Sequence, residues 1–311
     1  LRPERHGGGS TGPPAGGSMS NLIERLKSEA PVVTDGAWGS LFLDAGMDPG
    51  QLGDEWNLTH PEKVEAVARA YVEAGSRIIL TNTFRSNRIT LEKHGLTGKI
   101  AELNRTGVEI SRRAAAGEAL VFASTGPTGK LMVTGDITSE ELEDVYTEQG
   151  ELLASAEPDA LLLETMADLD EVTIAVRAFR RTGLPVVACV AFDTGKAKDR
   201  TMMGVTPERA AAGLTEAGAD VIGANCGQGI EGYISICRRL RAATDRPLWI
   251  KPNAGLPELV GGHTVYRTGP EDFVAHLPAL IEAGAAFVGG CCGTSPDFIR
   301  AISRKLRSCT T

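Results

Sequence analysis

The sequence predicts a single (β/α)₈ barrel, and three observations lead to this fold class. A short β-rich run followed by an amphipathic segment repeats eight times along the chain. Most of the β-rich runs are continuously apolar, as is typical of strands buried on both faces of a parallel sheet. The length of 311 residues suits one large barrel. An open, doubly wound sheet is the alternative, but no Gly-x-Gly-x-x-Gly motif follows the first run.

The predicted strands are rich in Val, Ile, Leu and Ala, and helical patterns lie between them. In chain order, the predicted strands are 32–37, 77–84, 121–127, 160–166, 185–192, 221–227, 247–253 and 286–293. The clearest predicted helices are 61–74, 139–156, 169–182, 207–217 and 270–283. Three of these helices start with a proline, and a glycine follows the ends of most of them, which are ordinary signals for helix starts and stops.

The composition excludes several classes of partner. The formal net charge is −8, and Lys and Arg are scattered along the chain, so no basic stripe is present to bind nucleic acid. No stretch approaches the roughly 18 uninterrupted apolar residues that a membrane span requires. Six cysteines in a long chain without a secretory signal argue against a disulfide framework. We therefore expect a cytoplasmic protein whose reduced thiols are available to a metal.

The first eighteen residues differ from the rest of the chain. They are rich in Gly, Pro and Ser, and they contain almost no apolar side chains that could offset the entropy of ordering. They also lack the apolar stretch of a secretory signal. We expect residues 1–18 to be a disordered leader or a cloning remnant, with Met19 as the native start. Residues 19–311 then form the single barrel domain.

Polar, small and thiol residues gather where the predicted strands end. Barrels of this kind carry their chemistry at the C-terminal ends of the strands. Read in chain order, those ends are Asp35-Gly36, Thr81-Asn82-Thr83, Gly126-Pro127, Glu164-Thr165, Asp193, Asn225-Cys226-Gly227, Lys251-Pro252-Asn253 and Gly289-Gly290-Cys291-Cys292-Gly293. Packing alone does not require this pattern, so the sequence predicts a functional site at the barrel mouth.

Three cysteines of these strand ends predict a metal site. Cys226 ends the sixth strand, and Cys291 and Cys292 end the eighth, so the two ends lie roughly 10 Å apart at an interstrand spacing of about 4.8 Å. Three thiolates with one open position are typical of catalytic zinc, whereas structural zinc usually has four protein ligands. Adjacent residues of a strand point to opposite faces, so the neighbouring glycines must allow a local departure from strand geometry. Two small core residues or a redox pair are the alternatives for the adjacent cysteines.

An open zinc–thiolate site favours alkyl transfer to sulfur. Zinc lowers the pKa of a bound substrate thiol, so that the thiolate exists at neutral pH. Three anionic sulfurs leave the metal electron-rich, and the bound thiolate keeps its nucleophilicity. Water activation would be better served by His and carboxylate ligands, and none of the five histidines ends a predicted strand. The other cysteines, Cys189, Cys237 and Cys309, are expected to be inert.

Six motifs together carry a resemblance to a known family. They are Asp35-Gly36-Ala37, Thr81-Asn82-Thr83-Phe84, Leu163-Glu164-Thr165, Gly223-Ala224-Asn225-Cys226, Lys251-Pro252-Asn253-Ala254-Gly255 and Gly289-Gly290-Cys291-Cys292-Gly293-Thr294. Over residues 20–306 the chain resembles the homocysteine S-methyltransferase family. That family includes betaine–homocysteine methyltransferase, S-methylmethionine-dependent enzymes and the homocysteine-binding module of cobalamin-dependent methionine synthase. The chain looks most similar to the last of these, through Thr-Asn-Thr-Phe, Pro-Asn-Ala-Gly and Thr264-Val265-Tyr266.

The resemblance implies a zinc-dependent methyltransferase that methylates homocysteine to methionine, a step of methionine biosynthesis. It implies that Cys226, Cys291 and Cys292 bind Zn²⁺, and that Asp35, Gly36 and Glu164 hold the amino-acid end of homocysteine. Glu164 can pair with the substrate ammonium, and the N–H groups of Gly36, Ala37 and the following turn can bind the carboxylate. Other strand-end residues are expected to orient the ligands and shape the pocket. They are Asn82, Thr83, Asn225 and Asn253.

The methyl donor is left open by two departures from the family pattern. The chain ends soon after the eighth helix and has no Asp-x-His-x-x-Gly, the corrinoid-binding signature of methionine synthase. We therefore expect either a methylcobalamin on a separate corrinoid protein or a small donor such as S-methylmethionine. Betaine prefers an aromatic cage, but Arg85 stands where some betaine-dependent members have an aromatic, and only Trp38 and Tyr266 are well placed.

Three other functions remain as alternatives. The barrel could bind zinc or a thiol without catalysis and dock a corrinoid protein. It could methylate a thiol other than homocysteine. It could also be a lyase or aldolase that uses Lys251 as a Schiff base, although a lone lysine at a strand end is more often an ion-pair partner.

Overall fold

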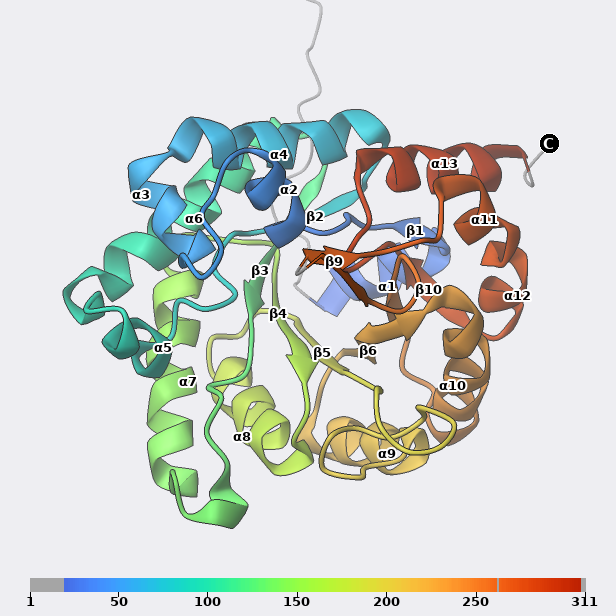
Figure 1. Cartoon of the computed structure of the whole chain (residues 1–311). Helices are drawn as coiled ribbons and strands as arrows, with labels where there is room; N and C mark the ends of the chain where they lie inside the picture. The colour runs from blue at the N-terminus through green and yellow to red at the C-terminus, as the bar shows by residue number, and fades with distance from the viewer. Residues whose placement is uncertain (1–19, 262, 309–311) are drawn as a thin grey trace, which may run out of the picture.

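Eight parallel strands, each followed by helical structure, form a nearly closed ring in the computed structural model (Figure 1), which describes residues 20–261 and 263–308. The order around the ring is β1-β10-β7-β6-β5-β4-β3-β2. The strands are β1 (Val32–Val33), β2 (Ile78–Leu80), β3 (Leu120–Thr125), β4 (Ala160–Met166), β5 (Val186–Val190), β6 (Val221–Gly229), β7 (Leu248–Asn253) and β10 (Ala285–Val288). The predicted (β/α)₈ barrel is confirmed.

The seam between β1 and β2 lacks a strand ladder, and single hydrogen bonds close it. Arg77 N donates to Val33 O over 2.8 Å, and Ser76 Oγ donates to Thr34 O over 3.2 Å. Both strands are shorter than predicted, because the polar residues that follow Val33 and Leu80 leave the ladder and turn into the loops of the mouth. The apolar pattern shows where a strand is buried but not where its ladder stops.

The helices around the ring follow the predicted pattern closely. The helices α4 (Pro61–Ala74) and α9 (Pro207–Ala217) have the predicted bounds, and α7 (Ser139–Ala154) and α8 (Leu169–Arg180) end two residues early. The predicted helix 270–283 is instead broken into α11 (Pro270–Ala275) and α12 (Leu277–Glu282). Pro278 lies in the first turn of α12, and it has no N–H to continue the hydrogen bonds of α11.

The remaining elements cover the sides and the two ends of the barrel. They are α1 (Ser20–Ser28), α2 (Gly39–Asp44), η1 (Gly53–Glu55), α3 (Trp56–Thr59), α5 (Arg88–Lys93), η2 (Thr97–Lys99), α6 (Ile100–Ala115), η3 (Met132–Thr134), β8 (Glu258–Val260), β9 (His263–Val265), α10 (Ile230–Ala243) and α13 (Pro296–Ser308). The antiparallel pair β8–β9 is an insertion between β7 and α11, and it lies in front of the ring in Figure 1. It was not predicted from the sequence.

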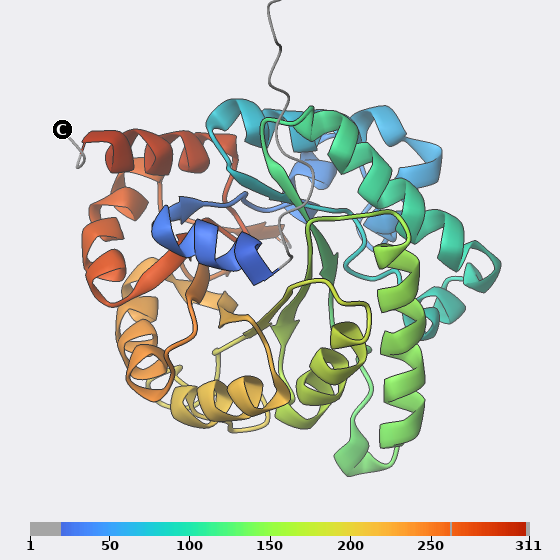
Figure 2. The same cartoon turned by 180° about the vertical axis from the view of Figure 1, so that it is seen from behind.

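The amino-terminal end of the barrel is closed by apolar side chains. Helix α1 lies across this end (Figure 2), and its residues Ile23 and Leu26 belong to one buried cluster with Phe122, Trp249 and Phe287 of the barrel interior. The Trp249 ring stacks on Phe122 with centroids 5.7 Å apart. Burial of these large rings supplies much of the hydrophobic stabilisation of the interior. The opposite, carboxyl-terminal end is therefore the open mouth.

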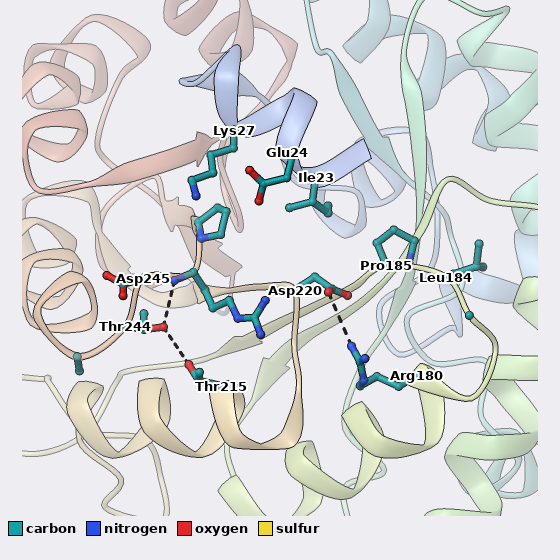
Figure 3. Close-up of a pocket in the computed structure, with 14 residues that line it drawn as sticks. Ile23, Glu24, Lys27, Arg180, Leu184, Pro185, Thr215, Asp220, Thr244 and Asp245 are labelled. Atoms are coloured by element: carbon teal, nitrogen blue, oxygen red, sulfur yellow. Dashed lines mark hydrogen bonds and ion pairs between the residues drawn. The ribbon is translucent and has the colours of Figure 1, made fainter. Parts of the chain in front are cut away.

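A cavity of about 790 Å³ lies beside α1 at the closed end (Figure 3). Arg180 and Asp220 form an ion pair of 3.7 Å on its wall, and Thr215 and Thr244 share a hydrogen bond of 2.9 Å. None of the residues predicted for the site lines it. This cavity is therefore separate from the predicted site.

Two expectations concern residues at the chain ends. The leader 1–18, its boundary at Met19, and Cys309 lie outside the described residues. Within residues 20–261 and 263–308, no helix combines the length and apolarity needed to cross a membrane.

Candidate metal centre and substrate pocket

The three predicted cysteines converge at the barrel mouth. The Sγ atoms of Cys226, Cys291 and Cys292 all lie within 4.8 Å of one another, and Cys226 Sγ is 3.8 Å from Cys292 Sγ. Only β7 separates β6 from β10 in the ring, as the sequence predicted. Within the described part of the chain, no other group of three or more His, Cys, Asp or Glu side chains is arranged to hold a metal.

Irregular backbone brings these sulfurs together. Cys226 has a left-handed φ of +62°, and the register between β6 and β7 shifts between Asn225 and Gly229. The strand β10 ends at Val288, before the cysteine pair. Gly289 has no room for a side chain, since a Cβ would lie 2.0 Å from Thr34 Oγ1. The expected departure from strand geometry around the cysteines is therefore confirmed.

The thiols compete for negative charge. Hydrogen bonds from Cys291 and Cys292 lower the pKa of Cys226, whereas hydrogen bonding to Cys226 raises the pKa values of Cys291 and Cys292. One thiolate is thus favoured, and a second is opposed by repulsion. A divalent cation would remove this repulsion and favour all three thiolates.

The surroundings of the thiols fit a zinc ion. Asn253 forms a side-chain hydrogen bond with Cys226, and its buried Oδ1 has no hydrogen-bond partner in the described structure. A buried acceptor without a partner is costly unless a cation or a donor meets it. Three thiols within 4.8 Å of one another match the donor set of a catalytic zinc site, in which three protein ligands leave the fourth position to water or substrate.

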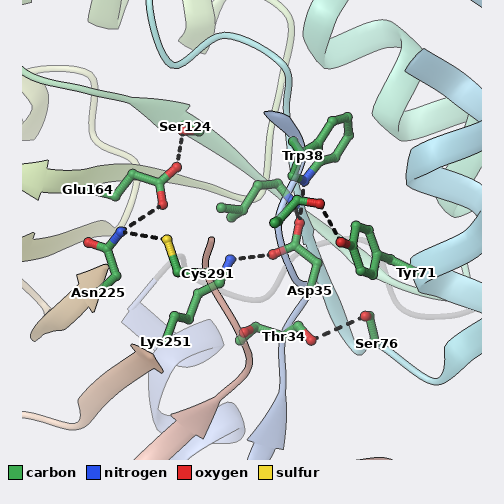
Figure 4. Close-up of polar contacts among 12 residues, drawn as sticks. Thr34, Asp35, Trp38, Tyr71, Ser76, Ser124, Glu164, Asn225, Lys251 and Cys291 are labelled. Atoms are coloured by element: carbon green, nitrogen blue, oxygen red, sulfur yellow. Dashed lines mark hydrogen bonds and ion pairs between the residues drawn. The ribbon is translucent and has the colours of Figure 1, made fainter. Parts of the chain in front are cut away.

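A carboxylate lies beside the thiols. Glu164 Oε1 accepts a 2.5 Å hydrogen bond from Ser124 Oγ, and Asn225 Nδ2 lies 3.4 Å from Glu164 Oε2 and 3.6 Å from Cys291 Sγ (Figure 4). Burial raises the pKa of Glu164 to about 7, although the nearby Lys251 lowers it. Asn225 therefore connects the thiols predicted to bind the metal to the carboxylate predicted to hold the substrate ammonium.

Asp35 bonds to several groups of the protein, and its predicted contact with homocysteine stays a prediction. Its Oδ1 forms a 2.5 Å ion pair with Lys251 Nζ, and its Oδ2 accepts from Leu80 N and Trp38 Nε1, each over 2.8 Å. Lys251 is 2% exposed and Asp35 is 0% exposed. Burial acts to lower the pKa of Lys251, but Asp35 and then Glu164 raise it. Lys251 is thus a charged ion-pair partner and not the neutral amine that a Schiff base needs.

Gly36 and Ala37 differ in the N–H that they offer. The Ala37 N–H donates to Thr294 Oγ1 over 3.2 Å. The Gly36 N–H has no acceptor among residues 20–261 and 263–308. A Cβ at Gly36 would lie 2.8 Å from Tyr71 Oη and 2.9 Å from Thr294 Oγ1, so only glycine fits. Gly36 is the better placed of the two for binding a carboxylate.

Asn82 and Thr83 hold the loops of the mouth. Asn82 Nδ2 donates to Gly53 O over 2.8 Å and to Asn57 Oδ1 over 2.9 Å. Thr83 Oγ1 donates to Ser124 O over 2.7 Å. Asn82 is 6% exposed and Thr83 is 0% exposed. Their predicted contact with substrate stays a prediction, and their present hydrogen bonds fix the η1 and β2–α5 segments.

Several residues of the site were not predicted. Ser124 donates a hydrogen bond to the Glu164 carboxylate, and Thr294 accepts one from Ala37 N, next to Asp35 and Gly36. The only sequence signal for Ser124 was a polar residue near the end of an apolar run. The Tyr266 ring packs on Gly293, where a Cβ would lie 2.3 Å from it. Burial and then Cys292 raise the pKa of Tyr266. The other aromatic, Trp38, donates to Asp35 and lies edge-on to Phe42.

The fold and the site together define a (β/α)₈ barrel with a cluster of three thiols that could hold a metal, next to a partly buried carboxylate. The chain belongs to the homocysteine S-methyltransferase family, whose model matches residues 32–306. The resemblance seen in the sequence is therefore confirmed.

Curated relatives and solved structures agree with this assignment. The chain is 32% identical to the methionine synthases of Mycobacterium leprae, over 93% of its length, and Mycobacterium tuberculosis, over 91%. It spans only 25% of each of these longer proteins. The metallated homocysteine methyltransferase MmuM from Escherichia coli has a TM-score of 0.77 at 21% identity, covering 91% of this chain and 99% of that chain. At that identity the match supports the fold.

Proposed function

We propose that this barrel transfers a methyl group to the thiolate of homocysteine to give methionine, with Zn²⁺ bound by Cys226, Cys291 and Cys292. The observation that carries the proposal is the convergence of three thiols beside a partly buried carboxylate at the open end of the barrel. The names of the relatives, methionine synthase and homocysteine methyltransferase, support the same acceptor.

The residues of the pocket would bind the substrate at both ends. When bound, Zn²⁺ would lower the pKa of the substrate thiol and present it as a thiolate. Glu164 in its ionised form accepts the substrate ammonium, and that positive charge favours ionisation of the carboxyl. The Gly36 N–H donates to the substrate carboxylate. Asn225 keeps Glu164 and Cys291 in a fixed relation, so that the thiolate points toward an incoming methyl group.

The surface around the mouth favours a methyl donor carried by a protein. Every exposed large hydrophobic residue in the described structure lies in a segment that follows a barrel strand, after β1, β3, β5 or β7. These residues, the apolar rim, are Leu43, Val133, Met202, Leu256, Leu259 and Val260. Leu256, Leu259 and Val260 follow the same strand, β7, and a contiguous exposed apolar patch is typical of protein contact surfaces. We therefore propose a methyl-corrinoid on a separate protein as the donor, with S-methylmethionine as the alternative.

A donor screen tests the function. Zinc-loaded protein is incubated with homocysteine and, in separate reactions, methylcobalamin, S-methylmethionine or betaine, and methionine is measured. Methionine from at least one donor, absent in the Cys226→Ala variant, is the expected result. Retained zinc without methionine from any donor would instead support the non-catalytic zinc-binding barrel. Replacing homocysteine with other thiols tests whether the acceptor is correct.

A further inference from the structure

Three tyrosines bind backbone carbonyl groups at the barrel mouth. Each is 0% exposed, and each joins a helix to the end of the barrel strand before it or to the loop after that strand. The pairs are Tyr71 of α4 with Ala37 O, Tyr146 of α7 with Gly126 O and Tyr233 of α10 with Cys226 O. Of these three carbonyl groups, that of Cys226 alone belongs to a residue of the thiol cluster.

Cys226 has a backbone conformation that the sheet does not impose. Its φ is +62°, and Gly227 follows with a φ of +71°. A left-handed conformation is unfavourable for a residue with a Cβ, so the surrounding structure has to hold it. The pairing of β6 with β5 ends at Ala224, and its register with β7 shifts between Asn225 and Gly229. Cys226 therefore lies outside both paired stretches of its strand.

Two contacts outside the ladders restrain this turn. A Cβ at Gly227 would lie 2.3 Å from Phe192 O, so the backbone there is packed against the segment after β5. Tyr233 Oη donates to Cys226 O over 2.7 Å, and the Tyr233 ring is part of the main hydrophobic cluster, which fixes the position of its hydroxyl. Since the direction of a carbonyl group follows the ψ angle of its residue, this hydrogen bond restrains the ψ of Cys226.

The position of the Cys226 thiol depends on that conformation. Successive side chains of an extended strand point to opposite faces, whereas a left-handed residue leaves this alternation. In the observed conformation Cys226 Sγ lies 3.8 Å from Cys292 Sγ, and the Sγ atoms of both lie within 4.8 Å of Cys291 Sγ. A change of φ and ψ at Cys226 would turn its Cα–Cβ bond and carry the sulfur away from the other two.

We propose that Tyr233 is a positioning residue of the metal centre. Its hydroxyl holds Cys226 in the left-handed conformation that directs Sγ toward Cys291 and Cys292, so the three thiols are arranged before a metal binds. Tyr233 acts through the Cys226 backbone and is not itself a ligand. This inference rests on the proposed function, because it takes Cys226 as a metal ligand.

The Tyr233→Phe variant tests the inference, because it removes only the hydroxyl group. Its zinc affinity, measured by competition with a chromogenic chelator, should fall about tenfold, as is typical when a hydrogen bond that orients a metal ligand is lost. Tyr146→Phe is the matched control. It also loses a fully buried tyrosine hydroxyl, which donates to Glu171 over 2.8 Å. The control should lower the urea midpoint at least as much, since its acceptor is a carboxylate, and should leave zinc affinity unchanged.

Cobalt(II) in place of zinc gives a readout that a loss of stability does not move. The thiolate-to-cobalt charge-transfer absorption increases with the number of thiolates bound to the metal. At saturating cobalt, Tyr233→Phe should lose up to about one third of this absorption per metal ion, as for one of three thiolates. Tyr146→Phe should have the wild-type spectrum.

A wild-type cobalt spectrum in Tyr233→Phe would overturn the inference even if zinc affinity fell, because all three thiolates would then still reach the metal. An equal loss of zinc affinity in Tyr146→Phe would overturn it as well, since the effect would then follow from stability. Failure of the proposed function gives a different result: wild-type zinc content in Cys226→Ala would contradict the proposed ligand set itself.

Discussion

The side-chain amide of Asn225 lies 3.6 Å from Cys291 Sγ, and its Oδ1 accepts the Thr165 N–H over 2.7 Å. Thr165 has a left-handed φ of +59°, a strained conformation for a β-branched residue. The same amide donates to Thr165 Oγ1 over 2.7 Å. Asn225 thus holds a strained turn on one side and the Cys291 thiol, a proposed metal ligand, on the other.

Replacing Asn225 should weaken the metal centre. In Asn225→Ala, Cys291 loses a donor and Thr165 loses its restraint, and loss of such supporting hydrogen bonds typically lowers metal affinity about 10–100-fold. Competition with a chromogenic chelator measures this affinity. Asn104→Ala is a suitable control, because Asn104 is a buried amide that bonds to loop backbone away from the thiols. Unchanged zinc affinity in Asn225→Ala would contradict the proposed role.

Removing a single cysteine should remove the metal. Cys226→Ala and Cys292→Ser each leave two sulfurs, and we expect the zinc content to fall from about one ion per chain to near zero, since three protein ligands are the minimum of a catalytic site. Elemental analysis after dialysis gives the content. Cys237→Ala is the matched control, because Cys237 is buried and its thiol donates to Ala283 O over 3.5 Å. Full zinc content in either site variant would refute the ligand assignment.

Homocysteine binding should depend on pH through Glu164. The pKa of this carboxyl is raised to about 7 by burial, and the substrate ammonium needs the ionised form. Affinity should therefore be complete above pH 8 and weaken about tenfold for each unit below 7. In Glu164→Gln this part of the dependence should vanish, while the part due to the substrate thiol stays. Titration calorimetry of both proteins across pH 5.5–8.5 gives the comparison.

Glu164 should also make the empty protein less stable. Its folded-state pKa lies above the ordinary value of 4.5, so the folded state binds the proton more tightly than the unfolded state does. The resulting loss of stability begins above pH 4.5 and is complete above pH 7. Glu164→Gln should therefore raise the free energy of unfolding at pH 8 by about 1–3 kcal/mol, measured by urea denaturation. No gain at pH 8 relative to pH 5 would argue against a raised pKa.

Removing one charge of the Lys251–Asp35 pair should lower the free energy of unfolding strongly, and removing both charges should lower it much less. Lys251→Met leaves Asp35 as an unpaired buried charge, for which a loss of about 3–5 kcal/mol is expected. The double variant with Asp35→Asn should recover most of that loss. Urea denaturation of the four proteins of the cycle yields the coupling energy, and additive effects would mean that the two side chains do not interact.

Substitutions in the apolar rim should affect the reaction only when the methyl donor is carried by a protein. Leu259 is 80% exposed, so Leu259→Glu should change the free energy of unfolding by less than about 0.5 kcal/mol. It should raise the KM for a methylated corrinoid protein several-fold and leave the rate with S-methylmethionine unchanged. An equal effect on both donors would place Leu259 in the substrate pocket instead of on a docking surface.

The fold was predictable because its signal is local and repeated. Continuous apolar runs identified the barrel strands, and the βα order fixed which strand ends are neighbours, so Cys226 could be placed near Cys291 and Cys292. Pro278 breaks a helix that apolar spacing alone predicted as continuous. The exposed pair β8–β9 has no buried face to produce a periodic pattern, since Glu258, Leu259 and Val260 are all exposed.

The roles of charged residues were harder to predict. Asp35 and Lys251 are separated by 216 positions in the sequence, and each sits at a strand end that could equally serve a substrate. Only the three-dimensional structure shows that they satisfy each other. Glu164 was correctly placed at the mouth, but its partners Ser124 and Asn225 come from different strands, and no spacing in the sequence links them.

The apolar cluster beneath α1 has a consequence for the order in which substrates bind. The amino-terminal end of the barrel is filled by Ile23, Leu26 and the rings of Phe122, Trp249 and Phe287. Acceptor and donor would therefore both approach the thiols from the carboxyl-terminal end. A donor that arrived first would stand between solvent and the thiols. On the proposed function we therefore expect an ordered reaction, in which homocysteine binds before the donor and methionine leaves after the demethylated donor.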